Sequence, residues 1–245
     1  MGVRLSDLIG MCLALIITLP FFLLIPILIK LDSPGPVLYR QVRTGCNRRR
    51  RERRVQNLQV GKDRRRSPRR VGNALGKPFT IYKFRTMVKD AERRSGPVWA
   101  MRDDPRITNL GHWLRSTHLD ELPQLWNVLR GDMSLVGPRP ERPEIIAKII
   151  HEIPAYEQRL LAKPGLTGLA QVCWKYDSSM EDVRKKLQLD LLYLARQTWH
   201  MRLRILMYTM IKALSPAATI GLDMLAPGVR ANVKLPTLEQ VAQKQ

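Results

Sequence analysis

The sequence has few of the residues that build disulfide frameworks or zinc sites. Its three cysteines, Cys12, Cys46 and Cys173, are an odd number at wide spacings and form no CxxC pair. The four histidines form no HExxH motif, which excludes the zinc hydrolases that depend on it. We expect neither a disulfide-stapled fold nor a structural zinc site, and the cysteine usage fits a reducing compartment.

Acidic residues are also scarce beside basic ones. The 245 residues include 42 Lys and Arg against 21 Asp and Glu, a formal net charge of +21. Such an excess indicates a polyanionic partner, but composition leaves open nucleic acid, an anionic membrane face or a phosphorylated substrate. The length predicts one substantial domain rather than two.

An uncharged apolar run covers residues 8–29, and about 20 such residues suffice to cross a bilayer core. A cleaved signal peptide is the competing interpretation, but the run is long for one and no small-residue cleavage site follows. Pro20 predicts a kink in this helix. Because Arg4 precedes the run and a basic block follows it, the positive-inside rule gives no crossing direction. A re-entrant helix would reconcile these features, and a spanning helix is the alternative.

A strongly basic block lies at about residues 46–72, with eleven Arg and one Lys against Glu52 and Asp63. It is too poor in apolar residues to fold by itself, so we predict a disordered insertion. A solvated loop without a specific role is one interpretation, and an anchor to anionic lipid headgroups is another. The block has no aromatic residue to stack on a base, so we expect no nucleic-acid partner.

The remaining pattern predicts an α+β, mostly helical domain. We divide the chain into a membrane helix at 1–31, a catalytic domain at 32–214 and a tail at 215–245. The predicted strands are short and cover residues 37–39 and 79–85, which places Lys83 and Arg85 on one face. Helices are predicted at 88–93, 110–115, 121–130, 144–150 and 154–161, and a capping box of Ser178 and Glu181 predicts another through Ala195.

Residues 199–214 combine apolar residues at helical spacing with cationic flanks. This pattern is typical of an amphipathic helix that either packs on the core or lies in a membrane interface.

Asp120 and Glu121 are the candidate catalytic carboxylates. Because Pro123 is tolerated only in the first turn of a helix, both residues fall at a helix start, where the dipole favours ionised side chains. An ionised carboxylate can attack phosphorus, and a neighbouring one can hold a divalent cation, for which oxygen ligands favour Mg²⁺. On spacing alone a simple helix cap is the better explanation, because such pairs open many helices.

Arg139 is held in the segment Gly137-Pro138-Arg139-Pro140. Two prolines restrict the backbone around this guanidinium, which suits it to bind a phosphate or diphosphate. A rigid surface loop without function is the alternative.

Four segments together resemble the bacterial sugar transferases known as monotopic phosphoglycosyl transferases. They are SPGPVLYRQVR, FTIYKFRTM, DDPRITNLGHWLRSTHLDELPQLWNVLRGDMSLVGPRP and KPGLTGLAQV, and they follow an N-terminal hydrophobic helix. The similarity runs from about residue 5 to residue 214 and is interrupted by the basic block.

The resemblance implies a re-entrant helix with interfacial amphipathic helices and a catalytic domain on the cytoplasmic face of the bacterial inner membrane. It implies transfer of a sugar phosphate from a UDP-sugar to undecaprenyl phosphate with release of UMP, a step that initiates surface glycan assembly. By the same resemblance Asp120 is the nucleophile that forms a covalent phosphosugar intermediate, and Glu121 is its partner for Mg²⁺. The implied substrate-binding residues are Pro138, Arg139 and Pro140 for the uridine nucleotide, with Lys83, Arg85, Arg115 and Asp190 as further phosphate contacts.

Two features depart from the family pattern. Leu19-Pro20 stands where members often carry Ser-Pro at the kink, so the hydrogen bond of that serine is missing. The Arg-rich insertion is longer than in related chains, but it interrupts no catalytic motif. The competing hypotheses are a non-enzymatic basic protein of membranes or nucleic acids, and an enzyme that spans the membrane and uses another acceptor.

Overall fold

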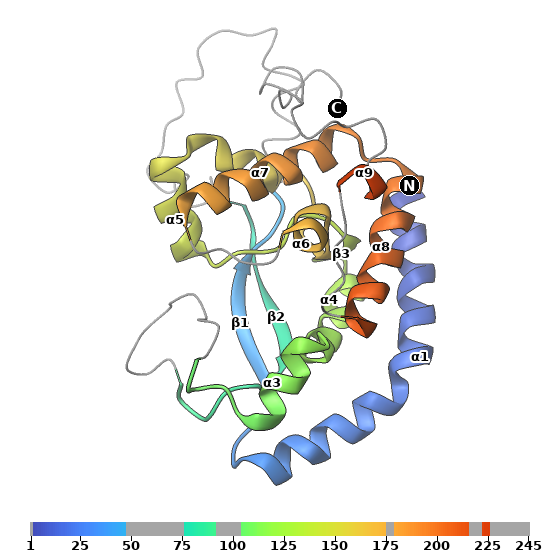
Figure 1. The fold of residues 1–245 in the computed structure, drawn as a ribbon, viewed down its shortest axis with the longest axis vertical. Coiled ribbons are helices and arrows are strands. Elements are labelled where there is room, and N and C mark those ends of the chain that lie inside the picture. The colour runs from blue at the N-terminus through green and yellow to red at the C-terminus, as the bar shows by residue number, and fades with distance from the viewer. Residues whose placement is uncertain (1, 48–75, 92–103, 175–178, 216–221, 226–245) are drawn as a thin grey trace, which may run out of the picture.

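The structure is a computed structural model that describes residues 2–47, 76–91, 104–174, 179–215 and 222–225. Within these ranges the fold is mostly helical, with two small two-stranded sheets (Figure 1). Most of the Arg-rich block, for which disorder is predicted, and most of the tail lie outside the described residues.

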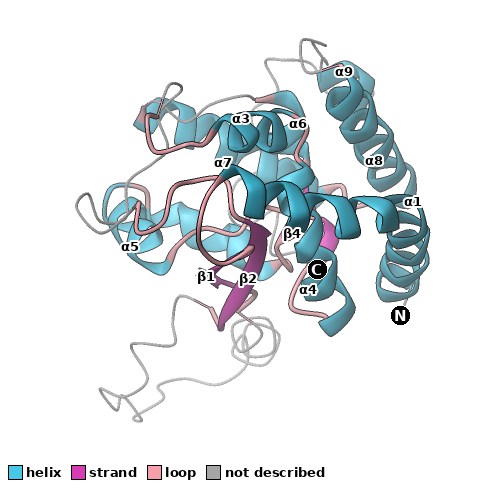
Figure 2. Ribbon diagram, turned by 90° about the horizontal axis from the view of Figure 1, so that it is seen from below, coloured by secondary structure: helices cyan, strands magenta, loops and turns pink. Residues whose placement is uncertain are grey.

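Helix α1, Gly2–Asp32, extends along one side of the molecule beside α8, Trp199–Leu214 (Figures 1 and 2). Among the described residues it is the one helix long and apolar enough to cross a membrane. Much of its surface is exposed and apolar, including Leu13, Ile16 and Leu23. The expected N-terminal apolar helix is therefore present.

Strands β1, Leu38–Thr44, and β2, Pro78–Phe84, form an antiparallel pair in the middle of the molecule (Figure 1). Both sequence predictions were right in place, but β1 is longer than the predicted 37–39. Pairing with β2 extends it, from Leu38 opposite Phe84 to Thr44 opposite Pro78.

The predicted helix at 121–130 is wrong in its first half. The structure has a 3-10 helix η2, Leu119–Gln124, followed by α4, Leu125–Arg130. Pro123 has no N–H to donate in a helix. The turn before it is closed by a bond from Glu121 N to His118 O, which spans three residues as in a 3-10 helix rather than four as in an α-helix. The predicted stop is confirmed, since Gly131 caps α4 with φ 83.

The short strands β3, Ser134–Val136, and β4, Gly165–Thr167, pair in parallel and were not predicted. Three residues carry no readable alternation, so only tertiary contacts reveal them. The predicted helix at 88–93 is wrong in its described part, where Lys89–Ala91 form a turn.

The other helices surround these strands. The predicted cap of α7, Met180–Ala195, is one residue off, because Ser179 rather than Ser178 accepts the bond from Asp182 N. The remaining described elements are α3 (Asn109–Ser116), α5 (Pro143–Glu152), η3 (Pro154–Leu161), α6 (Leu169–Cys173), α7 (Met180–Ala195) and α9 (Leu222–Leu225).

Helix α1 contributes to the core at two points. Met11 packs into the central cluster with Leu125 and Tyr193. Ile25 and Ile29 pack with Phe84 of β2 and Leu114 of α3, as Phe22 also does against the Phe84 ring. The helix is thus part of the folded domain, which favours a retained segment over a cleaved signal peptide.

We expect Ile25→Ala to lower the free energy of unfolding by about 2–5 kcal/mol, because the truncation leaves a cavity in this core. Thermal unfolding in detergent measures the change. The matched control is Ile27→Ala, since Ile25 is 0% and Ile27 59% exposed. Equal losses in the two variants would contradict packing of this end of α1 against β2 and α3.

Candidate active site

Asp120 and Glu121 lie together in η2, against β2. Both side chains are buried, at 6% and 7% exposure, and neither caps a helix. His118, which directly precedes η2, has a left-handed backbone with φ 58. Such strained positions in non-glycine residues cluster at functional sites. The simple-cap interpretation therefore does not describe this pair.

Glu121 is bound by two cations. Its Oε1 accepts from Lys83 Nζ at 2.6 Å and from Arg139 Nη2 at 2.5 Å, while Oε2 accepts from Arg139 Nη1 at 3.4 Å. Burial raises the pKa of Glu121, but Arg139 and Lys83 outweigh it and hold that pKa well below its usual range. Glu121 is therefore ionised, and both of its oxygens are occupied.

Asp120 has a different environment. Within the described chain its one close cation is Lys83, with Nζ 4.0 Å from Oδ2, and its carboxylate accepts no hydrogen bond. Burial raises the pKa of Asp120, the charge of Lys83 lowers it, and Glu121 raises it further. The expected effect of the helix start is outweighed by burial, so ionisation of Asp120 depends on the neighbouring cations. Its oxygens are left open to a reaction partner.

The loop that carries Arg139 is fixed through its carbonyl groups. Arg159 Nη2 donates to Arg139 O at 2.9 Å, and Arg43 Nη1 donates to Pro140 O at 3.1 Å. At Gly137 a Cβ would lie 2.4 Å from Lys163 O, so the loop leaves β3 by a path that only glycine permits. These contacts, with Pro138 and Pro140, restrain the loop, and the Arg139 guanidinium reaches Glu121.

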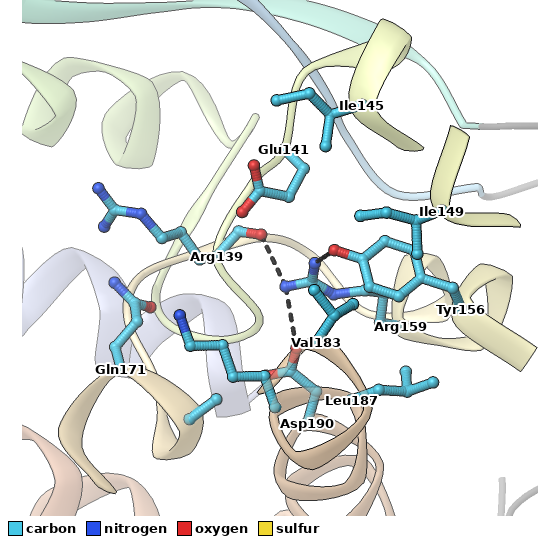
Figure 3. A pocket seen from close by; sticks show the side chains of 12 residues that line it. Arg139, Glu141, Ile145, Ile149, Tyr156, Arg159, Gln171, Val183, Leu187 and Asp190 are labelled. Atoms are coloured by element: carbon cyan, nitrogen blue, oxygen red, sulfur yellow. Dashed lines mark hydrogen bonds and ion pairs between the residues drawn. The ribbon is translucent and has the colours of Figure 1, made fainter. Parts of the chain in front are cut away.

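Asp190 supports this loop from below. Its Oδ2 lies 2.9 Å from Arg159 Nη2, and both side chains are buried. Figure 3 shows Arg159 between the Arg139 carbonyl and Asp190, while the Arg139 guanidinium points to the opposite side. Burial raises the pKa of Asp190, and Arg159 lowers it. The structure thus places Asp190 in a supporting ion pair rather than among the groups around Asp120 and Glu121.

The other predicted cations separate into two groups. Lys83 reaches the dyad directly, and Arg115, whose Nε donates to Thr86 Oγ1 at 2.9 Å, lies near enough for the Asp120 charge to act on it. Arg85 contacts the end of α1 instead, donating to Ser33 O at 2.5 Å and Ile29 O at 3.3 Å. The prediction of Arg85 as a phosphate contact is not supported by these bonds.

Sequence reasoning missed several members of this network. Arg43, Glu141, Tyr156 and Arg159 all support the Arg139 loop, and Glu141 pairs with Arg43 at 3.2 Å. Arg43 and Glu141 are 98 residues apart in the chain. No local motif relates residues so distant, so only the fold brings them together.

A pocket opens beside the Arg139 loop. It is lined by Arg139 and Glu141 from the loop, Gln171 from α6, and Lys186 and Asp190 from α7 (Figure 3). No group of three His, Cys, Asp or Glu side chains within the described ranges is placed to hold a metal ion. The dyad itself offers the open carboxylate of Asp120 and the occupied one of Glu121.

We expect Asp190→Asn to lower the free energy of unfolding by about 3–5 kcal/mol, because it leaves the Arg159 charge buried without a partner. Chemical denaturation in detergent measures the loss. Glu181→Gln is the matched control, since the pair of Glu181 with Lys185 is exposed and contributes at most about 1 kcal/mol. A loss as small as that of the control would show that Asp190 does not hold Arg159.

The model of the family described as "Bacterial sugar transferase" matches residues 1–54 and 65–216. The gap between the two segments lies inside the Arg-rich block.

Several curated proteins are similar to this chain. A Bacillus subtilis (strain 168) protein, provisionally named an undecaprenyl-phosphate N-acetylgalactosaminyl 1-phosphate transferase, is 44% identical over 64% of this chain and 72% of its own length. The exopolysaccharide production protein PSS of Rhizobium leguminosarum bv. phaseoli is 36% identical over 86% of this chain and 94% of its own length. The UDP-glucose:undecaprenyl-phosphate glucose-1-phosphate transferase of Klebsiella pneumoniae is 36% identical over 85% of this chain, which spans 39% of that longer protein.

Proposed function

This chain belongs to the bacterial sugar transferase family, and we propose that it transfers a sugar 1-phosphate from a UDP-sugar to undecaprenyl phosphate. The relatives named as transferases act on undecaprenyl phosphate, and one is named for UDP-glucose. The observation that carries the proposal is the division of the dyad, in which Glu121 is bound by Lys83 and Arg139 while the Asp120 carboxylate stays open.

The proposed chemistry proceeds in two displacements at phosphorus. An Asp120 oxygen attacks the phosphorus next to the sugar, and the bond to the bridging oxygen breaks, so that UMP leaves with that oxygen. An oxygen of the lipid phosphate then attacks the same phosphorus and releases the Asp120 carboxylate, which forms the lipid diphosphate sugar. Catalysis of this kind rests on positioning and charge stabilisation.

Three cations lie near the dyad. Lys83 stands between Asp120 and Glu121, and Arg115 lies on the Asp120 side. Arg139 is bound to Glu121, yet its side chain is 39% exposed, so the side chain is partly accessible. We assign Arg139, Arg115 and Lys83 to the diphosphate, and Pro138, Arg139 and Pro140 to the uridine nucleotide, as the family resemblance implies.

Magnesium is part of the proposal, with Asp120 and Glu121 as its protein ligands. Mg²⁺ is commonly bound by one or two carboxylates together with substrate phosphates, which suits the open oxygens of Asp120. Glu121 would take part only by exchanging Lys83 or Arg139, because both of its oxygens are occupied. When bound, the ion would offset the negative charge of the diphosphate.

We further propose that α1 is re-entrant and anchors the domain on the cytoplasmic face of the inner membrane. Both ends of α1 contact the same folded domain, through Asp7 to Arg202 and through Ser33 to Arg85. A straight span would carry its first residues to the far side of the bilayer. Pro20 and Pro26 lie inside the helix, which follows a bent path in Figure 1.

A hydroxyl takes the place of the family's missing serine. Thr18 Oγ1 donates to Ala14 O at 2.7 Å, two residues before Pro20. Bonds of this type often bend helices, and this one supports a kink at Leu19-Pro20.

Helix α8 would lie in the same interface. It buries Met201, Arg202 and Ile205 against the domain, and it exposes an apolar stripe on the outside. The amphipathic pattern therefore serves core packing on one side, and we propose lipid contact on the other. The exposed stripe consists of Trp199, Leu203, Met207, Met210 and Ile211. Binding of the Arg-rich block to anionic headgroups, and a role in initiating surface glycan assembly, stay part of the proposal.

The experiment that tests the function is an assay of UMP release. Purified protein with Mg²⁺, undecaprenyl phosphate and a panel of UDP-sugars should release UMP with the correct sugar. Without the lipid, release should stop at about one UMP per enzyme, as the covalent intermediate requires. No UMP with any UDP-sugar would overturn the proposed function.

We expect Asp120→Asn to reduce UMP release by a factor on the order of 10³ or more, because the amide is not a nucleophile. The same variant should trap no labelled sugar phosphate on the protein. Asp132→Asn is the matched control, since Asp132 lies on the turn after α4 and pairs with Arg130. Turnover of Asp120→Asn at the control rate would refute the covalent route.

The pH dependence should report the state of Asp120. Lys83 lowers the pKa of Asp120, so its removal raises that pKa and requires a higher pH for the ionised nucleophile. In Lys83→Met we therefore expect the acid limb of kcat/KM to move to higher pH. Lys89→Met, on the exposed turn after β2, should leave the limb in place, and an unmoved limb in Lys83→Met would contradict this role.

A further inference from the structure

A buried ion pair fastens the start of α1 to the domain. Asp7 Oδ1 lies 2.6 Å from Arg202 Nη2 of α8, and Asp7 Oδ2 accepts from Ser134 Oγ at 2.8 Å. The two charged residues are 2% and 4% exposed. Removing two charges from water has a large desolvation cost, which further hydrogen bonds to the pair must offset.

Those further bonds go to strand β3. The Leu135 N–H donates to Asp7 Oδ1 at 3.2 Å, and the Val136 carbonyl accepts from Tyr193 Oη at 3.1 Å and Arg202 Nη1 at 3.3 Å. In the described chain β4 is the only strand paired with β3. A three-residue strand with one partner is weakly held, and side chains of α1, α7 and α8 supply the remaining contacts.

Strand β3 leads directly into the loop of Arg139. Val136 ends the strand, and Arg139, three residues later, binds both oxygens of Glu121. The contacts of β3 with α1 therefore help to set the position of the backbone from which the Arg139 side chain extends to Glu121.

The other end of α1 is fastened through Arg85. This side chain donates to the carbonyl groups of Ile29 and Ser33 and to the Ser33 hydroxyl, at the end of the helix where cations are favoured. Gly35, which lies beside Arg85 Nη1, has φ 131, a backbone conformation that favours glycine. Arg85 follows β2, two residues after Lys83, the second cation of Glu121.

We propose that α1 is a brace that sets the two cations of Glu121, with Asp7, Arg202 and Arg85 as positioning residues for the transfer reaction. The inference rests on the proposed function and goes beyond it, since none of these three residues touches the dyad. On this proposal, the position of α1 in the membrane and the positions of Lys83 and Arg139 at the site depend on each other.

Two double variants separate positioning from simple stabilisation. Asp7→Asn with Arg202→Gln removes the charges but keeps an acceptor for Leu135 and a donor for Val136. Asp7→Leu with Arg202→Met replaces the pair by apolar side chains, a change that is often neutral or favourable for stability. Only the second leaves the bonds of Asp7 and Arg202 to β3 unmade, while the bond from Tyr193 to Val136 and the pairing with β4 stay in both.

The readouts are kcat and the two KM values, normalised to folded protein, with UMP release as the assay. We expect the polar double variant to keep a kcat close to wild type and the apolar one to lose roughly tenfold, because small misplacements of charged groups are costly. The KM for undecaprenyl phosphate should stay unchanged. Glu181→Gln with Lys185→Met, an exposed pair on α7, is the control.

Arg85 keeps the inference testable if the apolar variant fails to fold. Arg85→Met should lower kcat roughly tenfold, and Arg85→Lys should recover most of it by restoring a cation at the helix end. Wild-type kcat in folded Asp7→Leu/Arg202→Met, or in folded Arg85→Met, would overturn the brace. A wild-type protein without UMP release would instead overturn the proposed function.

Discussion

Glu121 is the residue on which the arrangement of this site depends. A buried carboxylate is tolerable only when cations surround it, and here Arg139 binds it with two nitrogens while Lys83 binds it from β2. The bonds of Glu121 to Lys83 and Arg139 join three separate segments of the chain. Because Glu121 takes up these cations, Asp120 keeps a carboxylate that is near a positive charge but bonded to none.

The 3-10 turn explains how two neighbouring residues reach such different environments. Successive side chains in a 3-10 helix point about 120° apart, so Asp120 and Glu121 diverge. Their pKa values consequently move in opposite directions, upwards for Asp120 through burial and downwards for Glu121, where cations outweigh burial. His118, with its left-handed backbone, precedes this turn, and Pro123 lies inside it.

The sequence was sufficient wherever the signal was local. The periodicity of α8 predicted its bounds, Gly131 predicted the end of α4, and the prolines around Arg139 predicted a rigid loop. It failed where a signal depends on partners distant in the chain. Asp7 and Arg202 are 195 residues apart, and Arg85 looked like a phosphate ligand until its bonds to the end of α1 were known. The order of α and 3-10 turns around Asp120 was also hidden, because both tolerate Pro123.

In the free protein the site has more positive than negative side chains, a charge that would suit a bound diphosphate. Lys83, Arg115 and Arg139 stand against two carboxylates, and only one carboxylate is fully paired. An incoming diphosphate would find cations already positioned by the fold, so little reorganisation is needed as charge develops. Its arrival would also bring negative charge towards the Lys83 side, which raises the cost of an ionised Asp120 unless a further cation enters. The buried geometry that leaves Asp120 open is thus our reason for proposing Mg²⁺ in this reaction.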